Sequence, residues 1–204
     1  MRILLVCAVA GMAMTSAAAQ GRGPAQPAPD EALVIIDIQN FYFEGGQLPL
    51  TNPVEAAAEA RRVLDRYRSL HLPVIHVRHM PAKGPANDQY LIHASVTPLP
   101  GEKVIIKHYA NAFRDTELLD YLKQAGIRKL VICGMQTQMC VEATARAAAD
   151  LGFDVTVVAD ACATRPLEYG GTSVPAAQVH AAALATLKGT YAKVVTTDEL
   201  LKAK

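Results

Sequence analysis

Six short runs rich in Val, Ile and Leu recur along this chain, and segments of helix-forming composition separate them. The runs cover residues 32–36, 73–77, 103–106, 129–133, 153–159 and 192–195. Strands that are apolar at consecutive positions, rather than at alternate ones, are typical of a parallel sheet covered on both faces. The pattern predicts an α/β fold, namely a three-layer, doubly wound, Rossmann-like arrangement of helices on both faces of a mostly parallel six-stranded sheet.

Four helices are predicted from their end signals. The first covers residues 52–70 and begins Asn52-Pro53-Val54-Glu55, where Asn is the expected cap, Pro occupies the first turn and Glu completes the cap. The others cover residues 116–124, 139–151 and 174–187, and a glycine follows each of them. Residues 81–101 carry Pro, Gly, Asn and Asp without clear periodicity, and this predicts a long loop of the kind that covers a site.

The first 19 residues have the pattern of a secretory signal peptide. Arg2 provides the positive start, residues 3–14 are apolar, and small residues at 17–19 precede the expected cleavage before Gln20. The apolar stretch is shorter than the ~20 residues of a membrane-spanning helix. Residues 20–30, rich in Gly, Pro and Gln, predict a flexible lead-in, and residues 31–204 predict one domain. We therefore expect an exported protein, periplasmic or secreted and not membrane-bound after processing; retention of the leader as an anchor is the alternative.

The charges of the chain nearly cancel. The chain has 20 Lys and Arg and 19 Asp and Glu, which gives a formal net charge of +1. Removal of Arg2 with the leader lowers this net charge to zero. Such a chain has neither the broad basic surface that binds nucleic acid nor an acidic one for cationic partners. The expected partner is a small neutral or weakly charged molecule, and no nucleic acid is expected.

Three reactive side chains lie at or beyond the carboxyl ends of predicted strands, where open parallel sheets bind ligands. Asp37 follows residues 32–36, Lys107 follows 103–106, and Cys140 lies past 129–133 at a predicted helix start. A thiol at a helix N-terminus near a lysine is expected to have a lowered pKa and thiolate character. The spacing alone is equally compatible with a salt bridge beside a buried cysteine.

The other cysteines have simpler interpretations. Cys133 lies inside an apolar run, where a free cysteine behaves as a small buried hydrophobe, and Cys162 is also expected to serve packing. Three cysteines remain after removal of the leader, so at least one thiol is unpaired in an exported protein.

Sequence blocks in a fixed order resemble those of one enzyme superfamily. They are Ala-Leu-Val-Ile-Ile-Asp-Ile-Gln at 32–39, then Lys107, then Gly-Met-Gln-Thr-Gln-Met-Cys-Val at 134–141, and Asp-Ala-Cys-Ala-Thr at 160–164. Over nearly the whole chain after the leader, the sequence resembles the isochorismatase-like cysteine hydrolases, which include nicotinamidases, carbamoylsarcosine amidase, ureidoacrylate-type hydrolases and streptothricin hydrolase. The resemblance implies a catalytic triad of Asp37, Lys107 and Cys140. It also implies a cis bond between Met135 and Gln136 that directs the backbone N–H groups of Gln136 and Cys140 toward an oxyanion.

The resemblance implies a hydrolase that cleaves a C–N bond of a small amide, carbamoyl or lactam substrate through a thioester on Cys140. Asp37 would accept the thiol proton, and Lys107 would orient Asp37. Two alternatives stay open: vinyl-ether hydrolysis of the isochorismatase type, which does not require the thiol, and an exported non-enzymatic binding protein on the same scaffold. Because family members are commonly dimers or larger and the predicted helices are rich in alanine, we also expect a homo-oligomer.

No metal or other cofactor is expected. Nicotinamidases carry a metal site of Asp and His after the strand of the catalytic Asp, whereas residues 41–50 here contain no His. His76 and His79 lie three residues apart on a strand and should point to opposite faces, so they are expected to be polar or core histidines. His108 keeps a Cys–His pair open, because it neighbours Lys107 and imidazole is the commoner base for a thiol.

Substrate contacts are predicted less sharply. Three aromatic residues follow the first strand: Phe41, Tyr42 and Phe43. They are expected either to line a pocket or to fill the core or a subunit interface. Gln39 is a candidate either for substrate contact or for a structural hydrogen bond to the backbone. Tyr169 is a further candidate, with a surface role as its alternative, and the same holds for Arg114. The loops at 41–50 and 81–101 should set the specificity, so the substrate stays unnamed.

Overall fold

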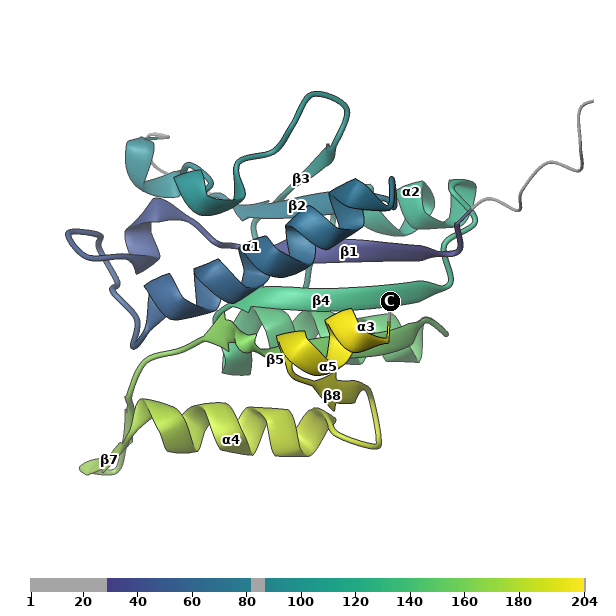
Figure 1. Cartoon of the computed structure of the whole chain (residues 1–204). Helices are drawn as coiled ribbons and strands as arrows, with labels where there is room; N and C mark the ends of the chain where they lie inside the picture. The colour runs from purple at the N-terminus through teal and green to yellow at the C-terminus, as the bar shows by residue number, and fades with distance from the viewer. Residues whose placement is uncertain (1–28, 82–86, 204) are drawn as a thin grey trace, which may run out of the picture.

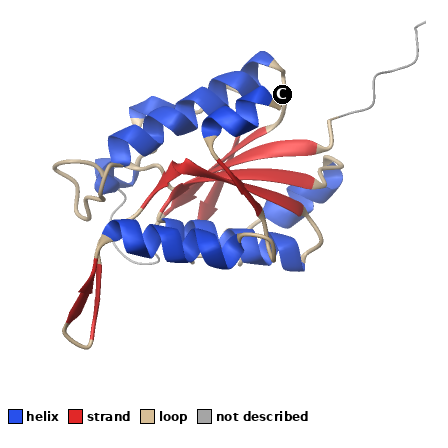
Figure 2. Cartoon of the chain, turned by 60° about the horizontal axis from the view of Figure 1, so that its bottom comes forward, coloured by secondary structure: helices blue, strands red, loops and turns tan. Residues whose placement is uncertain are grey.

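A six-stranded parallel sheet forms the middle layer of the molecule. The computed structural model describes residues 29–81 and 87–203, so the predicted signal peptide and most of the predicted lead-in lie outside the described residues. The strand order is β3-β2-β1-β4-β5-β8, and every neighbouring pair is parallel. Helices cover both faces, with α1 and α5 together on one of them (Figures 1 and 2). The predicted three-layer α/β architecture is confirmed.

The strands follow the predicted apolar runs. They are β1 (Glu31–Ile36), β2 (Val74–His79), β3 (Lys103–Lys107), β4 (Lys129–Met135), β5 (Asp154–Ala163) and β8 (Lys193–Val195). The pairing register sets Ile36 of β1 beside Val77 of β2 and Gly134 of β4. The carboxyl ends of these central strands therefore meet at one edge of the sheet.

The helices are α1 (Pro53–Ser69), α2 (Leu118–Gln124), α3 (Glu142–Asp150), α4 (Ala176–Leu187) and α5 (Thr197–Lys202). The predicted start of α1 is confirmed, with Asn52 at the N-cap position and Pro53 in the first turn. The predicted capping hydrogen bond is not, because Asn52 takes a left-handed backbone (φ 53°) and its side chain caps no N–H group. Helix α5 was not predicted, although Thr196 and Glu199 form a capping box whose residue pattern is visible in the sequence.

Shorter elements fill the connections. Turns of 3-10 helix lie at Asn40–Tyr42 (η1), Asp88–Tyr90 (η2) and Ala94–Val96 (η3), and the last two belong to the predicted long loop. A small antiparallel hairpin, β6 (Leu167–Tyr169) with β7 (Thr172–Val174), projects from the body of the molecule (Figure 2). Within the described ranges, no helix is both long and apolar enough to cross a membrane.

Candidate active site

Asp37, Lys107 and Cys140 meet at the carboxyl edge of the sheet. Asp37 directly follows β1, Lys107 ends β3, and Cys140 lies in η4, a turn of π-helix at Thr137–Val141 that continues β4 into α3. The Lys107 Nζ is 2.6 Å from the Asp37 Oδ2 and donates to the Cys140 Sγ at 3.2 Å. The shared edge of the sheet therefore brings together three side chains that are up to 103 residues apart, as the positions 37 and 140 show.

The three side chains are shut off from bulk solvent. Asp37 and Lys107 are fully buried, and Cys140 is 7% exposed. A buried charge is costly unless it is paired, so the ammonium and the carboxylate each hold the other in place. Burial raises the pKa of Asp37, and Lys107 and the Cys140 thiol only partly oppose this rise. A carboxylate in this setting is a better proton acceptor than one in water.

The predicted lowering of the Cys140 pKa is wrong for the free protein. Burial, followed by the charge of Asp37, raises the pKa of Cys140 to about 12. Lys107 acts in the opposite direction, but it is already paired with the carboxylate. Cys140 is also inside a π-helical turn rather than at the exposed first turn of an α-helix. In the free protein, Cys140 is therefore a protonated thiol near neutral pH.

The turn between β4 and Cys140 contains the cis bond that the family resemblance implied. The bond between Met135 and Gln136 is cis. The side chain of Gln136 is buried, accepts from the Gln138 amide at 3.1 Å and donates to the Tyr42 hydroxyl at 3.4 Å. These contacts fix the turn against the wall that η1 provides.

A cavity of about 440 Å³ opens beside Cys140. Its lining is mostly apolar and aromatic, with few polar groups, as is usual for a small-molecule site. Of the aromatic residues predicted after β1, Phe41 and Tyr42 line it. The full lining consists of Phe41, Tyr42, Gln47, Leu48, His79, Pro81, Tyr90, Ala110, Gln136, Met139, Cys140 and Arg165.

Three candidates for substrate contact are not part of this lining. Gln39 is fully buried and its amide bonds backbone groups of His79 and Tyr90, so the structural alternative applies. Phe43 stacks on His93 at 3.7 Å and borders a different cavity, because the turn after η1 directs it away from Cys140. Tyr169 is 89% exposed on the β6–β7 hairpin. The two predicted loops nevertheless supply half of the lining, namely Phe41, Tyr42, Gln47, Leu48, Pro81 and Tyr90.

Arg114, the other weak candidate, also lies apart from this cavity. Its guanidinium packs over the Tyr109 ring at 3.7 Å, and its side chain is 60% exposed. It fits the surface role that the sequence left open.

The histidines divide between scaffold and site. His76 is buried and contacts Glu102 at 2.9 Å, as expected of a core histidine. His79 contacts the Lys107 Nζ at 3.4 Å and lines the cavity, and burial with the lysine charge lowers its pKa to about 4. His108 is exposed and bonds the Met80 carbonyl, so it does not pair with the buried Cys140.

Two residues of the lining, His79 and Arg165, were not predicted as site residues. His79 is the last residue of β2, so the strand-end rule would have selected it if β2 had been extended past Val77. Arg165 follows β5 by two residues and carries no local signal that separates it from a surface arginine.

The two other described cysteines do not line the cavity beside Cys140. Cys133 and Cys162 are buried free thiols, and burial raises the pKa of each. Within residues 29–81 and 87–203, no group of three or more His, Cys, Asp or Glu side chains is arranged to hold a metal ion.

Comparisons with known proteins agree on one family. The family described as the Isochorismatase domain matches residues 31–199. The isochorismatase family protein YddQ of Bacillus subtilis is 44% identical over 177 residues, which are 84% of this chain and 98% of that protein. The crystal structure of a putative isochorismatase hydrolase from Oleispira antarctica superposes with a TM-score of 0.84 at 44% identity, covering 88% of this chain and 100% of the other.

A similar relative carries a functional name. Streptothricin hydrolase of Streptomyces noursei is 35% identical over 167 residues, which are 75% of this chain and 58% of that protein.

Proposed function

Since the chain belongs to the isochorismatase family, we propose that it is a cysteine hydrolase that cleaves a C–N bond of a small amide, carbamoyl or lactam substrate. The observation that carries the proposal is the buried cluster in which the Lys107 Nζ contacts both the Asp37 carboxylate and the Cys140 sulfur. The similarity to a hydrolase of streptothricin supports it. The cavity of about 440 Å³ suits a small molecule.

Cys140 is the nucleophile in this mechanism, and Asp37 is its base. As the sulfur attacks the carbonyl carbon, the thiol proton passes to Asp37, whose raised pKa favours acceptance. The negative charge moves from the carboxylate toward the sulfur and the carbonyl oxygen. Lys107 stays within contact of both groups, so the buried positive charge is compensated at every stage.

The backbone N–H groups of Gln136 and Cys140 donate to the oxygen of the tetrahedral intermediate. Donors of this kind are typically worth ~3 to 4 kcal/mol of barrier each. Collapse of the intermediate breaks the C–N bond, Asp37 returns its proton to the leaving nitrogen, and a thioester remains on Cys140. Water then attacks the thioester, releases the carboxylic acid and restores the thiol.

Replacement of the nucleophile tests the proposal. We expect Cys140→Ala to lower kcat/KM for amide hydrolysis by at least about 10³-fold, because no other group can form the thioester. The measurement is ammonia or amine release from a panel of primary amides, carbamoyl compounds and lactams. Cys162→Ala is the matched control, because it removes a buried thiol that does not line this cavity. This variant should keep most of the activity.

Two outcomes would contradict the proposal. Hydrolysis that survives in Cys140→Ala would show that the C–N bond is cleaved without a thioester on Cys140. A wild-type protein that turns over no member of the panel, yet binds some of them, would favour a binding protein on this scaffold.

A further inference from the structure

Arg165 is a cation without an anionic partner beside Cys140. It is half-buried and lines the same cavity as the thiol. Its Nε is buried and has no hydrogen-bond partner, and its Nη1 makes only a long contact, 3.4 Å, with the carbonyl of the adjacent Pro166. Among the described residues, no carboxylate forms an ion pair with it, whereas Arg62, Arg68, Arg128 and Arg146 each have one.

A buried guanidinium Nε without an acceptor is costly for the free protein. A buried donor that lacks a partner destabilises the folded protein, and more strongly when the group is charged. Most charged side chains avoid this cost by turning toward solvent. Arg165 instead keeps its Nε buried in the wall of a cavity. Such an arrangement is expected where a ligand supplies the missing acceptor.

The charges around the cavity leave Arg165 uncompensated. Asp37 and Lys107 neutralise each other. Burial and Lys107 lower the pKa of His79 to about 4, so this imidazole is neutral near pH 7. Burial raises the pKa of Tyr42, so this phenol is also neutral. No acidic residue belongs to the described lining, and the cavity therefore carries one net positive charge from Arg165.

We propose that Arg165 binds a carboxylate of the substrate, so that the preferred substrate is a small amide that also carries one carboxylate. The planar fork of a guanidinium matches a carboxylate, which can accept two parallel hydrogen bonds. A dianion such as phosphate would bring a second charge that no described lining residue neutralises. The aromatic and apolar walls, which include Phe41, Tyr90 and Met139, suit a short apolar segment between the amide and the carboxylate.

This inference rests on the proposed function only for the identity of the substrate, because the anion site can be tested without turnover. Iodoacetate and iodoacetamide alkylate the same thiol and differ in one negative charge. We expect the ratio of the Cys140 alkylation rates, iodoacetate over iodoacetamide, to fall about 10-fold to 100-fold in Arg165→Gln. Mass spectrometry of the peptide that contains Cys140 measures both rates.

Two further variants keep this experiment decisive. Arg165→Lys retains the charge without the planar fork and should show an intermediate ratio. Arg114→Gln removes an exposed arginine outside the cavity lining and should leave the wild-type ratio. Circular dichroism verifies that each variant is folded. An equal ratio in wild type and folded Arg165→Gln would overturn the anion site.

Matched substrates then test the substrate class. Succinamate and its methyl ester differ only in the free carboxylate, and ammonia release reports both. Wild type should prefer succinamate, and Arg165→Gln should lose about 10-fold to 100-fold in kcat/KM for it while the ester changes about twofold or less. Equal turnover of both compounds by wild type would overturn the substrate class. Hydrolysis of neither, with an alkylation ratio that still depends on Arg165, would leave the anion site standing and count against the amidase.

Discussion

Gly134 allows strands β1 and β4 to approach each other closely next to the candidate site. It lies on β4 directly beside Ile36, the residue before Asp37, and its φ is +130°. A Cβ at this position would lie 1.9 Å from the Ile36 carbonyl oxygen, which is a backbone atom and cannot rotate away. Only glycine allows β1 and β4 to approach this closely just before the two strands deliver Asp37 and Cys140.

We expect Gly134→Ala to lower the free energy of unfolding by at least about 3 kcal/mol, because the strands must separate to admit the methyl group. Gly152→Ala is the matched control: its φ is also positive, at +88°, but nothing lies within 4 Å of the added Cβ. That change should cost only about 1 kcal/mol. Urea denaturation measures both, and equal losses would show that the close approach to Ile36 is unimportant.

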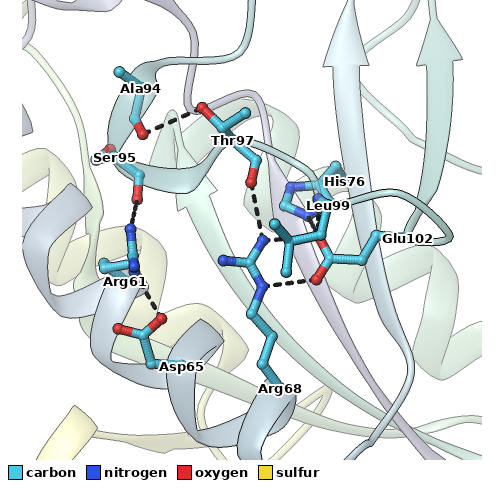
Figure 3. Close-up of polar contacts among 9 residues, drawn as sticks. All are labelled: Arg61, Asp65, Arg68, His76, Ala94, Ser95, Thr97, Leu99 and Glu102. Atoms are coloured by element: carbon cyan, nitrogen blue, oxygen red, sulfur yellow. Dashed lines mark hydrogen bonds and ion pairs between the residues drawn. The ribbon is translucent and has the colours of Figure 1, made fainter.

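At the scale of elements, Glu102 ties helix α1 to the sheet. Its carboxylate accepts from the Arg68 Nε at 2.7 Å and Nη2 at 2.8 Å, and from the Leu99 N–H at 2.8 Å, and it contacts His76 of β2 (Figure 3). Burial alone would raise the pKa of Glu102, but these donors outweigh it and lower the pKa to about 2. The ionised carboxylate therefore stabilises the packing of the long loop between β2 and β3.

This shift predicts a stability change in acid. The folded pKa of Glu102, about 2, lies below its ordinary value of 4.5, so its stabilisation is present above pH 4.5 and is lost as the pH falls toward 2. We expect Glu102→Gln to destabilise the protein by about 1 to 2 kcal/mol at pH 7, with allowance for solvent screening, and the difference from wild type to shrink through this window. Glu117→Gln, which removes an exposed partner of Lys103, should have little effect. A difference that is constant from pH 7 to 3, measured by denaturant titration, would contradict the assignment.

At the scale of the whole molecule, α4 presents an unusually apolar exposed face. The helix Ala-Ala-Gln-Val-His-Ala-Ala-Ala-Leu-Ala-Thr-Leu contains no Lys, Arg, Asp or Glu, and Ala177, Ala181, Ala182 and Ala185 are not among its buried residues. A groove of about 410 Å³ lies between this helix and the projecting hairpin. A twofold interface sets one surface against its own copy, so a charge-free face of small residues avoids self-repulsion. We therefore expect the partner on this face to be a second copy of this chain.

We expect the wild-type protein to be a dimer or larger, and Ala182→Glu to shift it toward the monomer. The change adds a third carboxylate to a groove that Glu142 and Glu168 already line, so it increases the repulsion between two copies. Ala58→Glu adds the same charge to an exposed position of α1, a helix that already carries several, and should leave the assembly intact. Sedimentation velocity measures both. A monomeric wild type at micromolar concentration would contradict the prediction.

Much of this molecule follows from local sequence patterns. The apolar runs determined six buried parallel strands, because a strand covered on both faces must be apolar at nearly every position. Once the strands are parallel, the residues at their carboxyl ends must share an edge, which is why Asp37, Lys107 and Cys140 could be selected from the sequence alone. The family resemblance added the cis bond at Gln136.

Only the tertiary structure determined how deeply those residues are buried and which side chains line the cavity. The helix start and the nearby Lys107 predicted a lowered pKa for Cys140, but the depth of burial, set by strands and loops distant in sequence, raises the pKa instead. Arg165 and Phe43 show the same limit: one lines the cavity and the other is turned out of it, with no local pattern to separate them from their neighbours. Periodicity is a property of adjacent residues, whereas desolvation and cavity shape are sums over atoms that only folding brings together.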